Sequence, residues 1–149
     1  DRQWQKIEDY SRIGIEQGAT LVTGGRGKPD GLDKGYYVKP TVFANVTPEM
    51  TIALEEMFGP VLAIQTFRTF DEAMTKANNT PYGLSGGVWT DKGAKIFKMT
   101  QGMRAGVVWA NTFNKFDPTS PFGGYKESGV GREGGLHGLD AYLDLGASR

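Results

Sequence analysis

Apolar residues recur at the i, i+3, i+4, i+7 spacing of an amphipathic helix in three stretches of the chain. The first stretch predicts a helix over Gln3–Gln17, with Gly18 where a left-handed C-terminal cap is expected. The second stretch spans Phe70–Ala77. The third follows Asp91, the expected N-cap, and ends near Gly102. These helices alternate along the chain with segments of strand character.

The strands are predicted at Tyr36–Phe43, Val61–Phe67, Leu84–Thr90 and Val107–Ala110. Pro40 marks the first of them as an edge strand or a bent one, because proline cannot donate a hydrogen bond to a ladder. The alternation of strands and helices favours right-handed crossovers and parallel strands. We therefore expect one α/β domain over residues 1–149, with a parallel sheet covered by helices on both faces.

Two carboxylates, a large ring and a Gly-Pro turn stand together in Glu55–Val61, directly before a predicted strand. Thr51 is expected to cap a short helix that leads into this segment. In open α/β sheets, ligands lie in crevices at strand ends, so the segment is a candidate binding turn. The alternative is an ordinary structural turn, since Gly-Pro pairs usually only punctuate a chain.

Composition and charge narrow the class of protein. The chain has 149 residues, within the range of one domain, and it carries 17 basic and 17 acidic residues. This balance offers no electrostatic reason to expect a nucleic acid or an anionic membrane as partner. No apolar run approaches the length that spans a bilayer, and no signal peptide pattern is seen, so the default expectation is a cytoplasmic protein.

The absence of cysteine excludes disulfides, thiolate metal sites and a cysteine nucleophile within these residues. The one histidine, His137, has no second ligand nearby in the sequence, so no metal site is predicted. Gly129–Gly134 satisfies the G-x-G-x-x-G dinucleotide fingerprint, but it follows a Pro-Phe-Gly-Gly turn instead of a strand within a βαβ unit. The hypothesis of a small stand-alone NAD-binding protein would require this segment to bind the dinucleotide.

Three separated motifs carry a family resemblance, namely Pro81–Ser85, Val108–Asn111 and Ser120–Glu133. In this order and spacing, together with the Glu-Met-Phe-Gly-Pro turn, they resemble the C-terminal part of the catalytic domain of the aldehyde dehydrogenase superfamily. The resemblance spans almost the whole chain. It implies that the chain is a fragment of a longer enzyme, whose dinucleotide-binding domain precedes this region.

The resemblance also implies a reaction. Members of the family oxidise an aldehyde to a carboxylic acid with NAD or NADP, through a thiohemiacetal formed on a cysteine thiolate. Neither the nucleophile motif nor the stretch that bears the general base matches anything in these residues. Both are expected upstream, so the isolated chain is expected to be inactive. The rival reading is a non-catalytic relative that acts as an interaction module.

Five residues take roles from the resemblance. Glu56 matches the carboxylate that hydrogen-bonds the ribose hydroxyls of the nicotinamide half, and Phe58 matches an aromatic that packs near the nicotinamide. Phe116 and Phe122 match aromatics of the aldehyde pocket. Glu133 matches a position expected to assist proton movement towards the general base. The alternatives are core packing for Phe58 and Phe116, and a surface pair with Arg132 for Glu133.

Two further expectations rest on weaker matches. Gln3 and Lys6 lie near the cofactor by alignment of the first helix, although surface solvation explains both. The parent enzyme is expected to be a homo-oligomer through a C-terminal strand, but Tyr142–Arg149 has little strand character.

Overall fold

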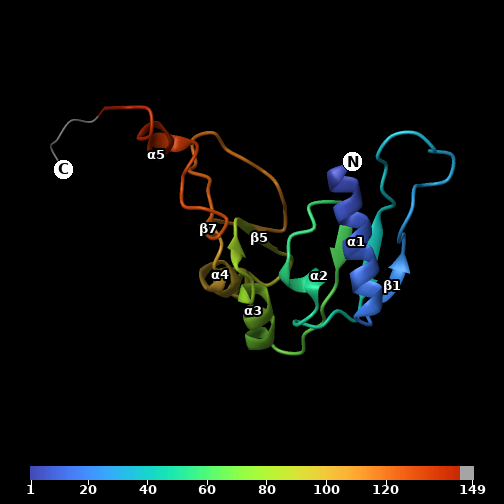
Figure 1. Ribbon diagram of the computed structural model, residues 1–149. Helices are drawn as coiled ribbons and strands as arrows, with labels where there is room; N and C mark the ends of the chain where they lie inside the picture. Colours follow the sequence, from blue (N-terminus) through green and yellow to red (C-terminus); the bar gives the residue numbers. More distant parts are fainter. Residues whose placement is uncertain (145–149) are drawn as a thin grey trace. The chain divides into compact units, whose positions relative to one another are not determined.

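The computed structural model describes residues 1–144 and divides the chain into two compact units, Asp1–Asn79 and Thr80–Arg149 (Figure 1). The single domain expected over residues 1–149 stays a prediction. The C-terminal strand expected of the family falls largely on residues 145–149, which lie outside the described residues.

The first unit opens with helix α1, Arg2–Glu16, which confirms the helix predicted from the apolar spacing. Gly18 follows with φ 94°, a left-handed conformation that glycine adopts without steric cost. Its N–H donates to Ile15 O at 3.0 Å, so the end of the helix is capped as predicted. The inner face of α1 is formed by buried Ile7, Glu8, Ser11 and Gly14.

A three-stranded sheet lies beside this helix, with strands β1 (Thr20–Thr23), β2 (Thr41–Ala44) and β3 (Val61–Ala63) in the order β1-β2-β3. Strands β1 and β2 pair antiparallel, whereas β2 and β3 pair parallel. The short helix α2, Thr51–Leu54, lies in the connection between the two parallel strands. The parallel β2–α2–β3 unit is the crossover that the alternating pattern predicts.

Two predictions about this sheet were wrong in detail. The strand predicted at Tyr36–Phe43 begins only at Thr41, and it is the central strand, not an edge. Pro40 stands just before it, so the first ladder N–H belongs to Thr41, which donates to Pro60 O at 2.9 Å. Strand β3 is shorter than predicted because its partner β2 ends at Ala44, and Asn45 then turns away with φ 55°.

The core of the first unit is centred on Phe43, which is fully buried. Buried Ile52 on α2 and Met57 after it belong to the same cluster. Gly14 brings α1 close to this cluster, since a Cβ at that position would lie 3.1 Å from Ile52 Cδ1 and 3.3 Å from Phe43 Cζ. Glycine therefore sets how closely α1 packs on the core.

The short helix α2 is not capped by the residue that the sequence indicated. Thr51 is not the N-cap of α2, since Met50 holds that position, and the Thr51 N–H donates to Gln17 Oε1 at 2.8 Å. In helix α3, Phe70–Asn78, the Thr69 hydroxyl accepts the N–H of Glu72 at 3.1 Å. Hydrogen bonds from Lys76 Nζ and from the backbone N–H of Arg68 lower the pKa of the Glu72 carboxyl.

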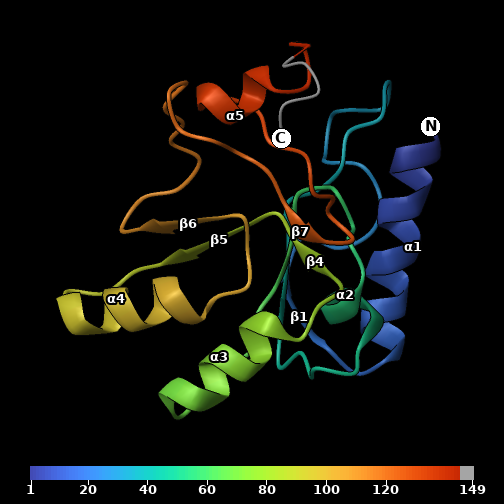
Figure 2. The same cartoon turned by 90° about the vertical axis from the view of Figure 1, so that its left-hand side faces the viewer.

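The second unit is built around parallel strands β5 (Ser85–Val88) and β6 (Val107–Ala110), with helix α4 (Gly93–Gly102) between them in the chain. Figure 2 shows α4 lying alongside this strand pair. Strand β6 has the predicted bounds. Strands β4 (Tyr82–Gly83) and β7 (Tyr125–Lys126) form a separate antiparallel pair, and the short helix α5 spans Gly135–Leu139.

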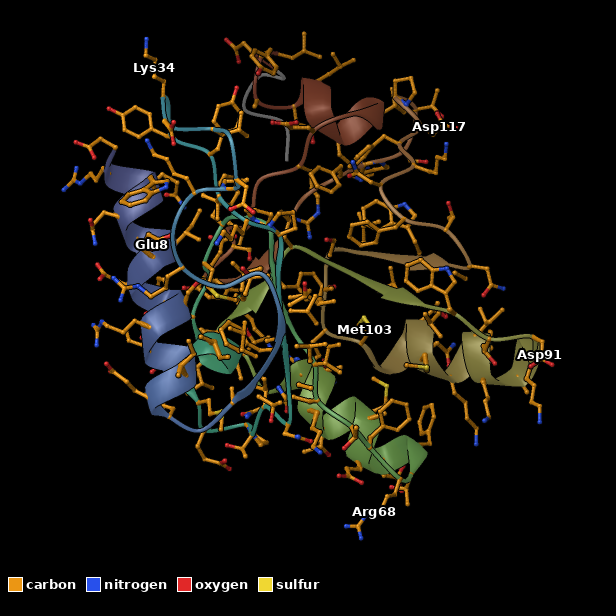
Figure 3. All side chains as sticks on the ribbon, turned by 90° about the vertical axis from the view of Figure 1, so that its right-hand side faces the viewer. Glu8, Lys34, Arg68, Asp91, Met103 and Asp117 are labelled. Carbon is orange, nitrogen blue, oxygen red and sulfur yellow. The ribbon has the colours of Figure 1, made fainter. Side chains whose placement is uncertain are left out.

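Asp91 does not cap α4, which corrects the prediction. It lies at the N-terminal end of the helix (Figure 3), but the N-cap is Lys92, without a side-chain hydrogen bond. The reason lies in the preceding strand end, where the Thr90 hydroxyl accepts the N–H of Lys92 at 3.3 Å.

Within residues 1–144, no helix is both long enough and apolar enough to cross a membrane.

A buried carboxylate holds the loop between β1 and β2. Glu8 on α1 is only 4% exposed (Figure 3), and both of its oxygens accept the N–H of Gly27, at 3.0 and 2.9 Å. Arg26 Nε lies 3.6 Å from Glu8 Oε2. Nearby, the N–H of Gly25 donates to the buried hydroxyl of Thr41 at 2.9 Å. The glycine-rich loop is therefore tied to the helix and the sheet by side chains.

We predict that Glu8→Ala lowers the free energy of unfolding of the chain by about 1–3 kcal/mol, because the half-buried N–H of Gly27 loses its charged acceptor. Urea denaturation followed by circular dichroism measures the change. The matched control is Glu16→Ala on the same helix, where the exposed carboxylate pairs with Arg12. Equal effects of the two substitutions would contradict a structural role for Glu8 in the loop.

Candidate functional site

The Glu-Met-Phe turn follows helix α2 in the first unit and presents two exposed side chains. Met57 is buried in the core cluster, while Glu56 and Phe58 on either side of it are exposed. Phe58 has φ 49°, an unusual backbone conformation for a residue with a side chain, and its side chain is 76% exposed. Burial of Met57 thus anchors a turn whose carboxylate and ring face outward.

Helix α1 clamps this turn from the side. Gln3 Nε2 donates to Met57 O at 3.0 Å and to Phe58 O at 2.8 Å. A Cβ at Gly59 would overlap the buried side chain of Ile7, so only glycine fits there. Sequence reasoning assigned Gln3 to the cofactor or to solvent and missed this role. No local signal announces it, because the partners lie 54 and 55 positions apart.

The two adjacent carboxylates differ in their surroundings. Glu55 Oε2 accepts the Tyr10 hydroxyl at 2.6 Å, and Lys6 Nζ lies 5.5 Å from the centre of the Tyr10 ring. These three residues line an open groove of about 900 Å³ along α1. Glu56 is not among the residues that line it, and within residues 1–144 its carboxylate has no hydrogen bond or ion pair. Glu56 is thus the carboxylate of the turn that is free to accept from a ligand.

In the second unit, aromatic rings gather at the carboxyl ends of β5 and β6. Trp109 on β6 is buried, and its ring centre lies 4.8 Å from that of Phe113 and 5.5 Å from that of Phe116, both in edge contacts. Phe116 in turn meets Phe122 at 4.9 Å. Ligands of open α/β sheets lie at this end of parallel strands. The two predicted pocket aromatics are therefore in contact with each other there.

Asn111 fixes the start of the loop that carries these rings. Its Oδ1 accepts the N–H of Thr90 at 2.9 Å, and its Nδ2 donates to Thr90 O at 3.0 Å. Asn111 itself has φ 53°, which turns the chain out of β6. The amide side chain thus continues the pairing between the two strands for one more step.

The same loop is ordered further along by Asp117 (Figure 3). Its Oδ1 accepts the Thr119 hydroxyl at 2.7 Å and the Thr119 N–H at 2.9 Å. The hydroxyl and then the N–H lower the pKa of the Asp117 carboxyl, because both stabilise its charged form. The sequence motif drew no attention to Asp117.

Glu133 and Phe122 face each other across an isolated antiparallel bridge. Each N–H donates to the other residue's carbonyl oxygen at 2.7 Å. Opposed residues of an antiparallel pair have their side chains on the same face, so the side chains of Glu133 and Phe122 leave the backbone in the same direction. The alternative pairing with Arg132 is absent from the described residues, and Arg132 Nη1 instead donates to the carbonyls of Gly124, Val130 and Gly131.

Of the three glycines in the G-x-G-x-x-G segment, Gly134 is the one that packs closely on other backbone, whereas a Cβ at Gly129 or Gly131 would meet no atom within 4 Å. A Cβ at Gly134 would lie 2.7 Å from Ser120 O, and Gly134 has φ 71°. The segment follows the short strand β7 instead of entering a βαβ unit, and the helix after it, α5, has only five residues. The segment therefore does not have the strand–turn–helix context of a dinucleotide fingerprint.

The structure thus brings Phe116, Phe122 and Glu133 together in the second unit. Glu56 and Phe58 adjoin each other in the first unit. Gln3 is the added member of that turn, and Trp109 is the added member of the aromatic group. Lys6 lies against the Tyr10 ring.

Comparisons with known proteins agree on one family. The profile of the aldehyde dehydrogenase family matches residues 1–147. Aldehyde dehydrogenase 1 from Tanacetum cinerariifolium is 49% identical over 144 residues, which make up 97% of this chain and 28% of that protein.

Solved structures match as well. An aldehyde dehydrogenase from Bartonella henselae superposes with a TM-score of 0.92 at 48% identity, over 97% of this chain and 30% of that one. The Mycobacterium tuberculosis aldehyde dehydrogenase, solved in complex with NAD+, superposes with a TM-score of 0.90 at 47% identity, over 99% of this chain and 32% of that one.

The chain therefore spans between 28% and 32% of the length of these relatives. Similarity at this level over nearly all of its residues confirms the expected α/β fold class, that of an aldehyde dehydrogenase catalytic domain. The chain belongs to the aldehyde dehydrogenase family.

Proposed function

We propose that the chain is part of an NAD(P)-dependent aldehyde dehydrogenase that oxidises an aldehyde to a carboxylic acid. The longer protein, called here the parent enzyme, would supply the cysteine nucleophile, which forms the thiohemiacetal, and the general base. The observation that carries the proposal is the clamped turn, in which an unpartnered carboxylate, Glu56, stands beside the exposed ring of Phe58. Family membership and the NAD+ complex of the Mycobacterium tuberculosis relative support the cofactor.

The chemistry of the turn fits a nicotinamide nucleotide. A carboxylate accepts hydrogen bonds from both hydroxyls of a ribose, and charge-assisted bonds of this kind are strong. The Phe58 ring offers an apolar face that limits where a neighbouring planar ring can swing. When bound, the nicotinamide supplies the hydride acceptor of the reaction. The share of Glu56, Phe58 and Gln3 is to hold and orient the nucleotide.

The aromatic group of the second unit fits the aldehyde. Phe116 and Phe122 present ring faces and edges that bury an apolar tail, or a quaternary ammonium group by cation–π attraction. Glu133, beside Phe122, places a carboxylate next to this wall, where it can assist proton movement towards the general base of the parent enzyme.

A non-catalytic interaction module is the second candidate, which the absence of cysteine from these residues would permit. An aldehyde-dependent assay of NADH or NADPH absorbance on the full-length parent enzyme distinguishes the two. Turnover supports the enzyme, and its absence across short, long and aromatic aldehydes supports the module.

We also propose that the parent enzyme is cytoplasmic and homo-oligomeric. Cell fractionation tests its location, and light scattering tests its oligomeric state.

We predict that Glu56→Gln in the parent enzyme lowers kcat/KM by about tenfold or more. The change keeps the shape but removes the charge, and a hydrogen bond to a charged group contributes about 1.5–3 kcal/mol. Steady-state and single-turnover assays measure it. The matched control is Glu55→Gln, whose carboxylate is already engaged by Tyr10, and it should leave the rate nearly unchanged. Wild-type rates for Glu56→Gln would refute the cofactor role.

A second prediction concerns the clamp. Gln3→Ala removes the Nε2 group that donates both hydrogen bonds to the turn, so Glu56 and Phe58 should lose their fixed placement and the KM for the cofactor should rise several-fold. Cofactor titrations at saturating aldehyde measure the change. Gln5→Ala is the control, because Gln5 lies two residues further along the same helix and its side-chain amide donates to Asp9 Oδ1 instead of to the turn. An equal rise in the KM for the cofactor in both variants would contradict the role of Gln3 in positioning the turn.

Phe122→Ala should change the order of preference among aldehydes more than it changes the KM for the cofactor. The ring is half-buried against Phe116, so its loss opens the wall that an apolar tail would contact. The ratios of kcat/KM across short, long and aromatic aldehydes measure this. Phe97→Ala, an exposed ring on α4, serves as control. An unchanged order of preference would count against the pocket assignment.

A further inference from the structure

Trp109 links the sheet of the second unit to the loop that carries the aromatic wall. It is 8% exposed, whereas Phe113 and Phe116 in the loop are 53% and 57% exposed. Its ring lies against both of them, at 4.8 and 5.5 Å between ring centres. A buried side chain on a strand is thereby the base on which two exposed loop rings rest.

The indole of Trp109 also makes a polar contact with the loop. Its Nε1 donates to Lys115 O at 2.8 Å, one residue before Phe116. This bond holds the backbone of the loop where the ring of Phe116 departs from it. Trp109 thus constrains Phe116 in two ways, through its ring and through its backbone.

The opposite strand leaves space for this arrangement. Gly87 on β5 pairs in register with Trp109 on β6. A Cβ at Gly87 would lie 2.9 Å from the ring of Trp89 and 3.4 Å from that of Phe113. Because Gly87 has no side chain, the Trp89 ring can lie close over the strand, where its centre is 6.4 Å from that of Phe113.

From this geometry we infer that Trp109 is a positioning residue that sets aldehyde specificity by holding Phe116 against Phe122. The inference rests on the proposed function, since it names a determinant of that same aldehyde site. Trp109 itself is buried beneath the wall and acts through Phe116. Its removal should therefore change which aldehydes the wall accepts and leave the cofactor turn unaffected.

The test uses Trp109→Phe in the full-length parent enzyme, which keeps a ring and removes the donor to Lys115. We expect the ratio of kcat/KM for a long-chain aldehyde to that for a two-carbon aldehyde to change about fivefold, which corresponds to about 1 kcal/mol. The change should reside in the KM for the long aldehyde. The KM for the cofactor and kcat with the short aldehyde should stay at their wild-type values.

Trp4→Phe is the matched control. Its indole makes the same kind of bond in the first unit, donating to Tyr37 O at 3.0 Å. Trp4→Phe removes one indole-to-carbonyl hydrogen bond, as Trp109→Phe does, but it should not change the ratio of kcat/KM between the long and the short aldehyde. An equal shift in the control would assign the effect to general loss of stability and overturn the inference.

A double variant tests whether Trp109 acts through Phe116. In a Phe116→Ala background, adding Trp109→Phe should change the aldehyde ratio no further, because the ring that Trp109 positions is already gone. A shift of the same size in both backgrounds would overturn the inference, as would no shift in either. Should Trp109→Phe fail to fold, Phe113→Leu removes the other exposed ring that contacts Trp109 and should change the ratio in the same direction.

Hydrogen exchange gives a readout that needs no turnover. Trp109→Phe should raise the exchange rate of amides in the 112–122 segment several-fold, while Trp4→Phe should leave that segment unchanged. Unchanged exchange in Trp109→Phe would overturn the inference even in an active enzyme. A parent enzyme that turns over no aldehyde refutes the proposed function, and exchange then still decides whether Trp109 orders the loop.

Discussion

Close approach of one segment to another, permitted where a side chain is missing, is the constraint on which both units depend. Gly59 lies so near Ile7 that any Cβ would overlap it, which lets α1 sit directly on the Glu-Met-Phe turn. Gly134 lies against the carbonyl of Ser120 in the same manner, which brings the Glu133 segment onto the aromatic loop. At Gly134 the opposing atoms are backbone, so no side-chain rotation can relieve the overlap. At Gly59 they belong to the side chain of Ile7, which is itself buried in the first unit.

Both parts of the candidate site use a buried anchor beside exposed functional groups. Met57 is buried between Glu56 and Phe58, and Trp109 is buried beneath Phe113 and Phe116. Apolar burial fixes the anchor, and hydrogen bonds to backbone carbonyls then fix the chain next to it, from Gln3 in one case and from Trp109 in the other. The exposed groups are therefore held in a defined position and remain accessible to a ligand.

Where the sequence predictions failed, a tertiary contact outweighed a local preference. Asp91 has the chemistry of an N-cap, but Asn111 and Thr90 hold the strand end, and α4 starts after Lys92. Thr51 was expected to cap α2, and the Gln17 side chain meets its N–H instead. Thr69, by contrast, caps α3 through a local contact, since its hydroxyl accepts the N–H of Glu72 three residues later. The sequence spacing of these two residues is sufficient to predict this cap.

By itself, the sequence determined the main helices, the strand at Val107–Ala110, the family resemblance and the candidate residues Glu56, Phe58, Phe116, Phe122 and Glu133. These depend on local periodicity and on motifs of adjoining residues. Only the tertiary structure decided that Glu133 faces Phe122, that Gln3 clamps the turn and that Trp109 supports Phe116. Such contacts join residues whose side chains meet through the packing of separate elements, and neither propensity nor periodicity carries information about which elements will meet.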